Sequence, residues 1–157
     1  MSEQTKDPNV ILQVSHISKR FTSKGVCVRA VTDVSFDVRK GETIGIVGES
    51  GCGKTTLGRC VVRAIEASEG EVKYTARDGV TYDFLRLNKT DMKKVRKEIQ
   101  MIFQDPYSSL DPRMTVIDII AEPLKANFPK MPKAEVEQKV IEKSQRDGLT
   151  VYHPSPF

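Results

Sequence analysis

A glycine-rich stretch carries the residue types best suited to chemistry. Residues 48–55 read GESGCGKT and satisfy the pattern G-x-x-x-x-G-K-[ST] at every fixed position. Glycines let many backbone N–H groups converge on a polyphosphate, and a helix that begins after the loop adds its partial positive charge. The lysine would reach the β- and γ-phosphates, and the threonine hydroxyl would bind Mg²⁺. The candidate nucleotide-binding residues are Gly48, Ser50, Gly51, Cys52, Gly53, Lys54, Thr55 and Thr56, with Thr55 also a metal ligand.

The elements that must position this loop are also indicated. Residues 43–47 (TIGIV) form a short apolar run, typical of a strand buried on both faces of a parallel sheet. A helical pattern follows over 54–67. The alternative, a chance glycine-rich turn, is disfavoured because strand, loop and helix occur in the required order. We interpret Cys52 as a loop position without a chemical role, but expect its alkylation to block nucleotide binding sterically.

The rest of the chain mixes strand and helix patterns, which predicts an α/β fold. Residues 22–27 have the composition of a loop, and Thr115 with Asp118 fits a capping box. In the expected helix 132–147, Glu135 and Glu142 each precede an opposite charge by one turn, at Lys139 and Arg146. The expected strands are 10–18, 30–38, 72–74, 80–84 and 99–103, and the expected helices are 90–97, 116–125 and 132–147.

Composition excludes several classes of protein. The 157 residues are 38% apolar and 29% charged, as in a soluble globular domain or part of one. We find neither an apolar run long enough for a membrane helix nor a secretory signal. Three cysteines and two histidines exclude a disulfide framework and a four-cysteine zinc site. The net charge of +4 resides in residues 85–98, which we interpret as a solvated helix face, because no aromatic residues interleave for nucleic-acid binding.

Three further features narrow the class of phosphate-loop protein. Phe21 ends a predicted strand in the sequence SKRF, Gln104 follows the apolar run 99–103, and the block YSSLDPRMTV comes directly before a helix. With "GESGCGKTTLGR" and "IFQDPYSSLDPRMTV", the chain resembles the ATP-binding subunits of ABC transporters, most closely the oligopeptide/dipeptide importer group. A phosphate-loop kinase or GTPase explains the sequence less well, because it would leave the block IFQDPYSSLDPRMTV unexplained.

This resemblance implies roles for individual residues, with ATP and Mg²⁺ as ligands. Phe21 matches the aromatic residue that stacks on adenine; the alternative is an ordinary core phenylalanine. Gln104 matches the glutamine that touches Mg²⁺ and the attacking water, and so is the candidate catalytic and second metal-binding residue; the alternative is a surface glutamine before a turn. Tyr107, Leu110 and Met114 are candidate permease contacts, although local packing explains them equally well.

The resemblance also implies a fold and its limits. We expect the P-loop NTPase fold of the ABC type, with an antiparallel β subdomain and a partial parallel core sheet, truncated within the helical subdomain. The signature loop, the Asp-Glu strand and the switch histidine of the family are not found. Without that strand, residues 44–47 should be left uncovered. The expected parts are a disordered N-terminus (1–9), an incomplete nucleotide-binding core (10–104), the start of the helical subdomain (105–147) and a non-family tail (148–157).

The implied function is that of an energy-coupling subunit, or a fragment of one, in an ABC importer of peptides. Its expected partners are the transmembrane permease subunits, a second ATP-binding subunit and, indirectly, a solute-binding protein, with no nucleic acid. The expected location is cytoplasmic, on the inner face of the cell membrane. Because the metal carboxylate and switch histidine are missing, we expect weak Mg-ATP binding with negligible hydrolysis. The alternative is a non-hydrolysing nucleotide-binding module that pairs with a permease or a full ATPase.

Overall fold

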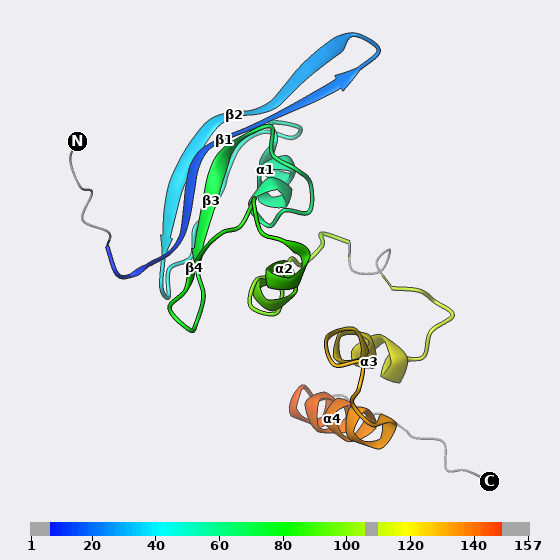
Figure 1. Ribbon diagram of the computed structural model, residues 1–157. Coiled ribbons are helices and arrows are strands. Elements are labelled where there is room, and N and C mark those ends of the chain that lie inside the picture. Colours follow the sequence, from blue (N-terminus) through cyan, green and yellow to red (C-terminus); the bar gives the residue numbers. More distant parts are fainter. Residues whose placement is uncertain (1–6, 106–109, 149–157) are drawn as a thin grey trace. The chain divides into compact units, whose positions relative to one another are not determined.

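The chain forms two compact units, residues 1–101 and 102–157 (Figure 1). The structure, a computed structural model, describes residues 7–105 and 110–148. None of the helices in the described ranges is long and apolar enough to cross a membrane.

The first unit is built on a four-stranded sheet with the order β2-β1-β3-β4. The strands are β1 (Val10–Ser23), β2 (Val26–Arg39), β3 (Glu69–Thr75) and β4 (Thr81–Asp83). All three strand pairs are antiparallel. The expected antiparallel β subdomain is therefore present.

The hairpin of β1 and β2 is longer than the sequence indicated. Pairing continues to Ser23 and Val26, so the turn consists of only Lys24 and Gly25. Their φ angles are 47° and 79°, and positive φ at both central residues is typical of a type I′ turn, whose twist matches that of the strands. The loop expected over 22–27 is therefore wrong, because the tight turn lets pairing run to the hairpin's end.

Two helices, α1 (Lys54–Val61) and α2 (Lys89–Val95), lie on one face of this sheet (Figure 1). The Asn88 side chain starts α2 by accepting hydrogen bonds from the backbone N–H groups of Thr90 and Asp91. The lysines of α2 face solvent, whereas Met92 and Val95 are buried, which agrees with the solvated face expected for residues 85–98. The core joins both helices to the strands through Val14, Ile17, Val31, Leu57, Cys60, Val72, Tyr74, Phe84, Met92 and Val95.

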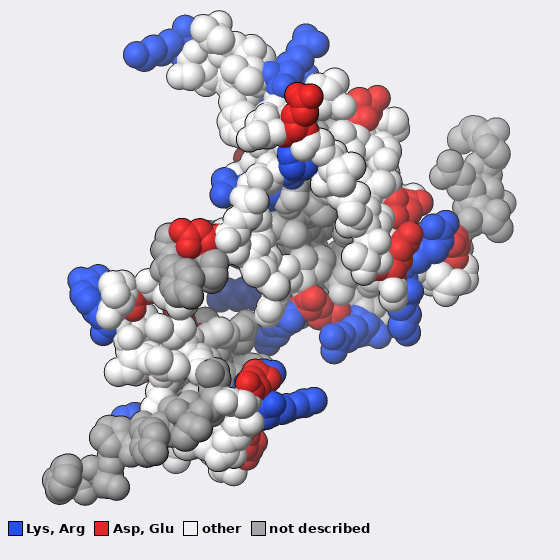
Figure 2. Space-filling view, turned by 180° about the vertical axis from the view of Figure 1, so that it is seen from behind, with Lys and Arg blue, Asp and Glu red and all other residues white. Residues whose placement is uncertain are grey.

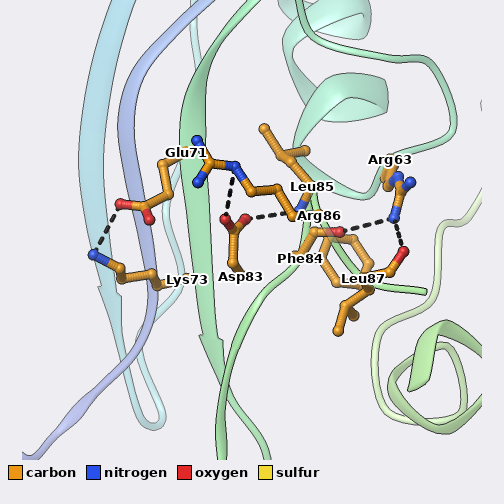
Figure 3. Close-up of polar contacts among 8 residues, drawn as sticks. All are labelled: Arg63, Glu71, Lys73, Asp83, Phe84, Leu85, Arg86 and Leu87. Carbon is orange, nitrogen blue, oxygen red and sulfur yellow. Dashed lines mark hydrogen bonds and ion pairs between the residues drawn. The ribbon is translucent and has the colours of Figure 1, made fainter.

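The helix after the phosphate loop ends earlier than predicted. We expected it to reach residue 67, but α1 ends at Val61, and Arg63 has a φ of 49°. The Arg63 guanidinium instead donates hydrogen bonds to the carbonyl oxygens of Phe84 (3.4 Å) and Leu87 (2.8 Å), as Figure 3 shows. A tertiary contact to the segment between β4 and α2 therefore accompanies the end of the helix. The Asp83–Arg86 and Glu71–Lys73 ion pairs in the same view lie nearer the surface.

The two strands expected in a parallel core sheet do not form. Residues 43–47 and 99–103 contain no strand. Val47 is 92% exposed and Ile102 94% exposed, so neither segment is buried on both faces. The physical reason is that a strand forms only when its backbone is hydrogen-bonded to a neighbouring strand. A parallel sheet also requires other elements to cover both of its faces. The exposure agrees with the expectation that residues 44–47 are left uncovered.

The second unit contains a helical pair, α3 (Val116–Asn127) and α4 (Lys133–Arg146). The predicted cap is confirmed, because the Thr115 hydroxyl oxygen accepts from the Asp118 N–H at 3.1 Å. The predicted Glu135–Lys139 pair is also present, at 3.7 Å. Ala121, Val136 and Val140 form the small core between the two helices. Both helices therefore form where the sequence predicted them, within one or two residues.

Candidate phosphate-binding site

The phosphate loop is a closed backbone turn in front of α1. Gly51 and Gly53 have φ angles of 80° and 98°, a region that favours glycine. A Cβ on Gly53 would lie 2.1 Å from the carbonyl oxygen of Ala30 on β2. The loop therefore packs so closely on the hairpin that only glycine fits at this position.

A β-bulge explains why Ala30 faces the loop. Lys19 pairs with Val31, whereas the next residue, Arg20, pairs with Arg29, so Ala30 is an extra residue on β2. A bulge bends its strand and redirects the groups beside it, and bulges are frequent next to functional sites. Here the bulge places a backbone carbonyl against Gly53.

The side chain of Lys54 is hydrogen-bonded to the backbone at the start of the phosphate loop. Its ammonium donates hydrogen bonds to the carbonyl oxygens of Gly48 (2.8 Å) and Glu49 (2.6 Å) and lies 3.7 Å from the Cys52 sulfur. The loop is thus curled around a positive charge. This is the arrangement that attracts a polyphosphate, because the ammonium and the loop amides act on the same small volume.

The start of α1 adds to this anion-attracting character. Its N-cap is Gly53, which provides no side-chain cap, and its first turn contains no acidic residue. The N–H groups at the helix start therefore carry a partial positive charge that no side chain of the cap neutralises. Thr55 is exposed and Thr56 half-buried in this first turn, so a hydroxyl oxygen, a hard ligand suited to Mg²⁺, is accessible there.

Phe21 lies on β1, close to the residues of β2 that meet the phosphate loop. It pairs with Val28, and β2 then runs from Val28 to Ala30, the residue against Gly53. Two strand residues span about 7 Å, comparable with the ribose and first phosphate between a base and the phosphates that the loop would hold. The side chain is 45% exposed, so the alternative of a core phenylalanine is disfavoured. The structure therefore brings the ring and the loop into one region.

The other predicted residues lie in the second unit. Gln104 is exposed there, as are Leu110 and Met114, whereas Tyr107 lies outside the described residues. Their roles stay predictions.

One residue of this region was missed by the sequence analysis. The ammonium of Lys19 lies 4.9 Å from the centre of the Phe21 ring. Burial raises the pKa of the Cys60 thiol on α1, and the positive charge of Lys19 opposes this rise in part. The available signal was the spacing of a lysine two residues before an aromatic residue in a strand, which places both on one face.

A hollow elsewhere on the first unit lacks the features of this site. It measures about 940 Å³, lies on the sheet and contains no residue of the phosphate loop. Two of its charges are paired with each other, Arg39 with Asp7 at 3.1 Å. Figure 2 shows acidic and basic side chains interspersed on the face it views, with no single charge gathered there. Nothing in this hollow indicates a ligand.

The family profile described as "ABC transporter" matches residues 31–152. The chain therefore belongs to the ABC transporter family. It is 42% identical over 147 residues to "Oligopeptide transport ATP-binding protein OppF" of Bacillus subtilis (strain 168), a match that covers 94% of this chain and 47% of the relative. The protein of the same name from Haemophilus influenzae is 41% identical over 154 residues, covering 92% of this chain and 45% of the relative.

Solved structures support the same fold. The dimeric post-hydrolysis structure of the ATP-binding cassette MJ0796, bound to ADP and Pi, has a TM-score of 0.68 at 21% identity, covering 89% of this chain and 58% of that chain. CbiO1 from Clostridium perfringens has a TM-score of 0.62 at 22% identity, covering 90% of this chain and 51% of that chain. The predicted family and the α/β fold class of the ABC type are thus confirmed, whereas the two strands expected in a parallel core sheet are not formed. The chain spans about half the length of the curated relatives it matches.

Proposed function

We propose that this chain is an ATP-binding, energy-coupling subunit, or part of one, of an ABC importer of oligopeptides. Family membership and the names of its relatives support this reading. The single observation that carries it is the loop closed around the Lys54 ammonium, which donates to the Gly48 and Glu49 carbonyls at the open end of α1.

The residues of the loop suit Mg-ATP. The glycines leave the backbone N–H groups accessible, and Lys54 can exchange its two carbonyl acceptors for phosphate oxygens, which bear more charge. The Thr55 hydroxyl would hold Mg²⁺, and the Phe21 ring would stack on adenine. Gln104 would be the second group near Mg²⁺, since an amide can bind the metal and donate to water. When bound, the metal would neutralise phosphate charge.

The partners follow from the proposed role. Permease subunits would dock on the second unit, where Leu110 and Met114 are exposed apolar side chains. A second ATP-binding subunit would complete the nucleotide site, and a solute-binding protein would act through the permease. The chain would then lie on the inner face of the cell membrane.

Calorimetry with Mg-ATP tests the binding step. Lys54→Met removes two or more charge-assisted contacts, each worth about 1.5–3 kcal/mol, so we expect affinity to fall at least tenfold. Lys40→Met, in the turn after β2, removes the same charge away from the loop and should bind as the unchanged chain does. Absence of binding heat from the folded, unchanged chain would refute the proposal.

Turnover separates the two candidate functions. We expect negligible hydrolysis by the chain alone, far below about 1 s⁻¹, the low end of the usual enzyme range. The alternative is a non-hydrolysing nucleotide-binding module that pairs with a permease or a full ATPase. Hydrolysis that appears only with a full-length second ATP-binding subunit, and disappears with Lys54→Met in this chain, favours the energy-coupling role. Binding without turnover in both assays favours the module.

A further inference from the structure

Lys19 and Phe21 form a cation–aromatic pair on β1, opposite the β2 segment that meets the phosphate loop. The Lys19 ammonium lies 4.9 Å from the centre of the ring, within the range of an attractive contact. The two residues are separated by Arg20 on β1 and therefore project from the same face of the strand.

This face is the one that meets α1. Lys19 pairs with Val31, which is buried, and the γ2 carbon of Val31 would lie 3.6 Å from a Cβ on Gly53. The influence of Lys19 on the Cys60 thiol of α1 agrees with this placement. Lys19 is therefore paired with the residue of β2 that lies beside Gly53, and it also contacts the aromatic ring.

An ammonium over one face of a ring does two things. It holds the ring by attraction to its electron-rich face, and it leaves only the other face for a second planar group. A ring fixed before binding loses less conformational freedom when a base stacks on it. The exposed fraction of Phe21, 45%, leaves room for such a stack.

We propose that Lys19 is a positioning residue for the nucleotide base, which covers one face of Phe21 and directs the base to the other. This rests on the proposed function, in which Phe21 stacks on adenine. Lys19 itself contacts neither the phosphates nor the base in this role.

The chain offers a clean optical probe of the ring. It contains no tryptophan, so Phe21→Trp introduces a single tryptophan at the ring position, whose emission can be excited separately from that of the four tyrosines. In this background, Lys19→Met should increase acrylamide quenching of Trp fluorescence without any ligand, and Lys19→Arg should restore the unchanged value. Lys24→Met, which removes the same charge from the turn of the same hairpin, should have no effect.

Two ligands separate positioning from simple charge attraction. With Phe21 in place, Lys19→Met should weaken Mg-ATP binding about two- to five-fold but leave inorganic tripolyphosphate binding unchanged, because only ATP carries a base. Combined with Phe21→Leu, the loss should be smaller than the sum of the single losses, since both changes remove one contact.

Several results would overturn the inference. Equal weakening of ATP and tripolyphosphate would make Lys19 a phosphate-attracting charge, and unchanged ATP binding would remove its role altogether. Unchanged quenching would show that the ammonium does not hold the ring. If the unchanged chain binds neither ligand, the proposed function itself fails, and the positioning role fails with it.

Discussion

The phosphate loop and the apolar segment directly before it differ in what holds them in shape. The loop is closed by Lys54, a residue of its own sequence motif, and rests on one backbone contact to Ala30. Residues 43–47 have strong strand composition, yet they form no strand, and Val47 is 92% exposed. A loop that satisfies its own polar groups can form locally, whereas a parallel strand requires neighbours that supply its hydrogen bonds.

The largest expected effect comes from Gly53, where the loop meets the hairpin. Gly53→Ala would place a methyl group 2.1 Å from the Ala30 carbonyl at a φ of 98°, so we expect a loss of at least about 2 kcal/mol in unfolding free energy, together with loss of ATP binding. Thermal unfolding and calorimetry measure the two effects.

Gly58→Ala is the matched control. Gly58 lies within α1, and a Cβ there would meet nothing within 4 Å. The substitution should stabilise the helix by up to about 1 kcal/mol and leave ATP binding unchanged. Similar destabilisation by both variants would contradict the specific contact at Gly53.

Alkylation of Cys52 sharpens the same comparison from the ligand side. Cys27 and Cys52 are exposed, whereas Cys60 is buried. In a Cys27→Ser background, alkylation should lower ATP affinity at least about tenfold by occupying the loop. A Cys52→Ser chain treated in the same way should bind normally, and normal binding by alkylated Cys52 would show that the loop does not surround phosphate.

A hydrogen bond next to the apolar residues 99–103 predicts an effect of pH on stability. The Tyr74 hydroxyl donates to Glu98, the residue directly before 99–103, at 2.8 Å. Burial first, and then this hydrogen bond, raise the pKa of Tyr74 to about 12. A raised pKa gives stability that is present below the ordinary tyrosine pKa, near 10, and is lost as pH rises toward about 12.

Chemical denaturation between pH 9 and 12 measures this loss. Tyr74→Phe should remove much of the fall in stability over that range, while Tyr82→Phe, on β4, serves as the control. An unchanged pH profile in the Tyr74 variant would show that this hydroxyl is not responsible.

The smallest effect on stability is expected in residues 43–47, which form no strand. Val47→Ser should change the unfolding free energy by less than about 0.5 kcal/mol, because this side chain is 92% exposed. Val72→Ala, in the buried part of β3, should cost about 1–3 kcal/mol. Val47→Ser should also reduce light scattering at high concentration, since exposed apolar segments promote association. A large stability loss at Val47 would mean that residues 43–47 are packed.

Prediction succeeded where the physical cause is local in sequence. The Thr115 cap, the helices of the second unit and the strand positions around Val14 and Val72 follow from short-range patterns. Prediction failed where contacts between residues far apart in the sequence determine the local structure. Residues 22–27 have a loop-like composition, yet the tight turn at Lys24 and Gly25 lets the two strands pair up to it. Arg63 adopts a non-helical backbone conformation, and its side chain donates hydrogen bonds to carbonyl oxygens of another segment.

By itself, the sequence determined the phosphate-loop motif, the family and the candidate residues for ATP, because glycine spacing, lysine and hydroxyl act within one short motif. Only the tertiary structure decided that a bulge at Ala30 excludes every residue but glycine at position 53, and that Lys19 covers the Phe21 ring. The first feature depends on the register between β1 and β2, which the turn that joins them and the burial of one face of the sheet set, and the second requires that residues 19–21 be extended on one strand.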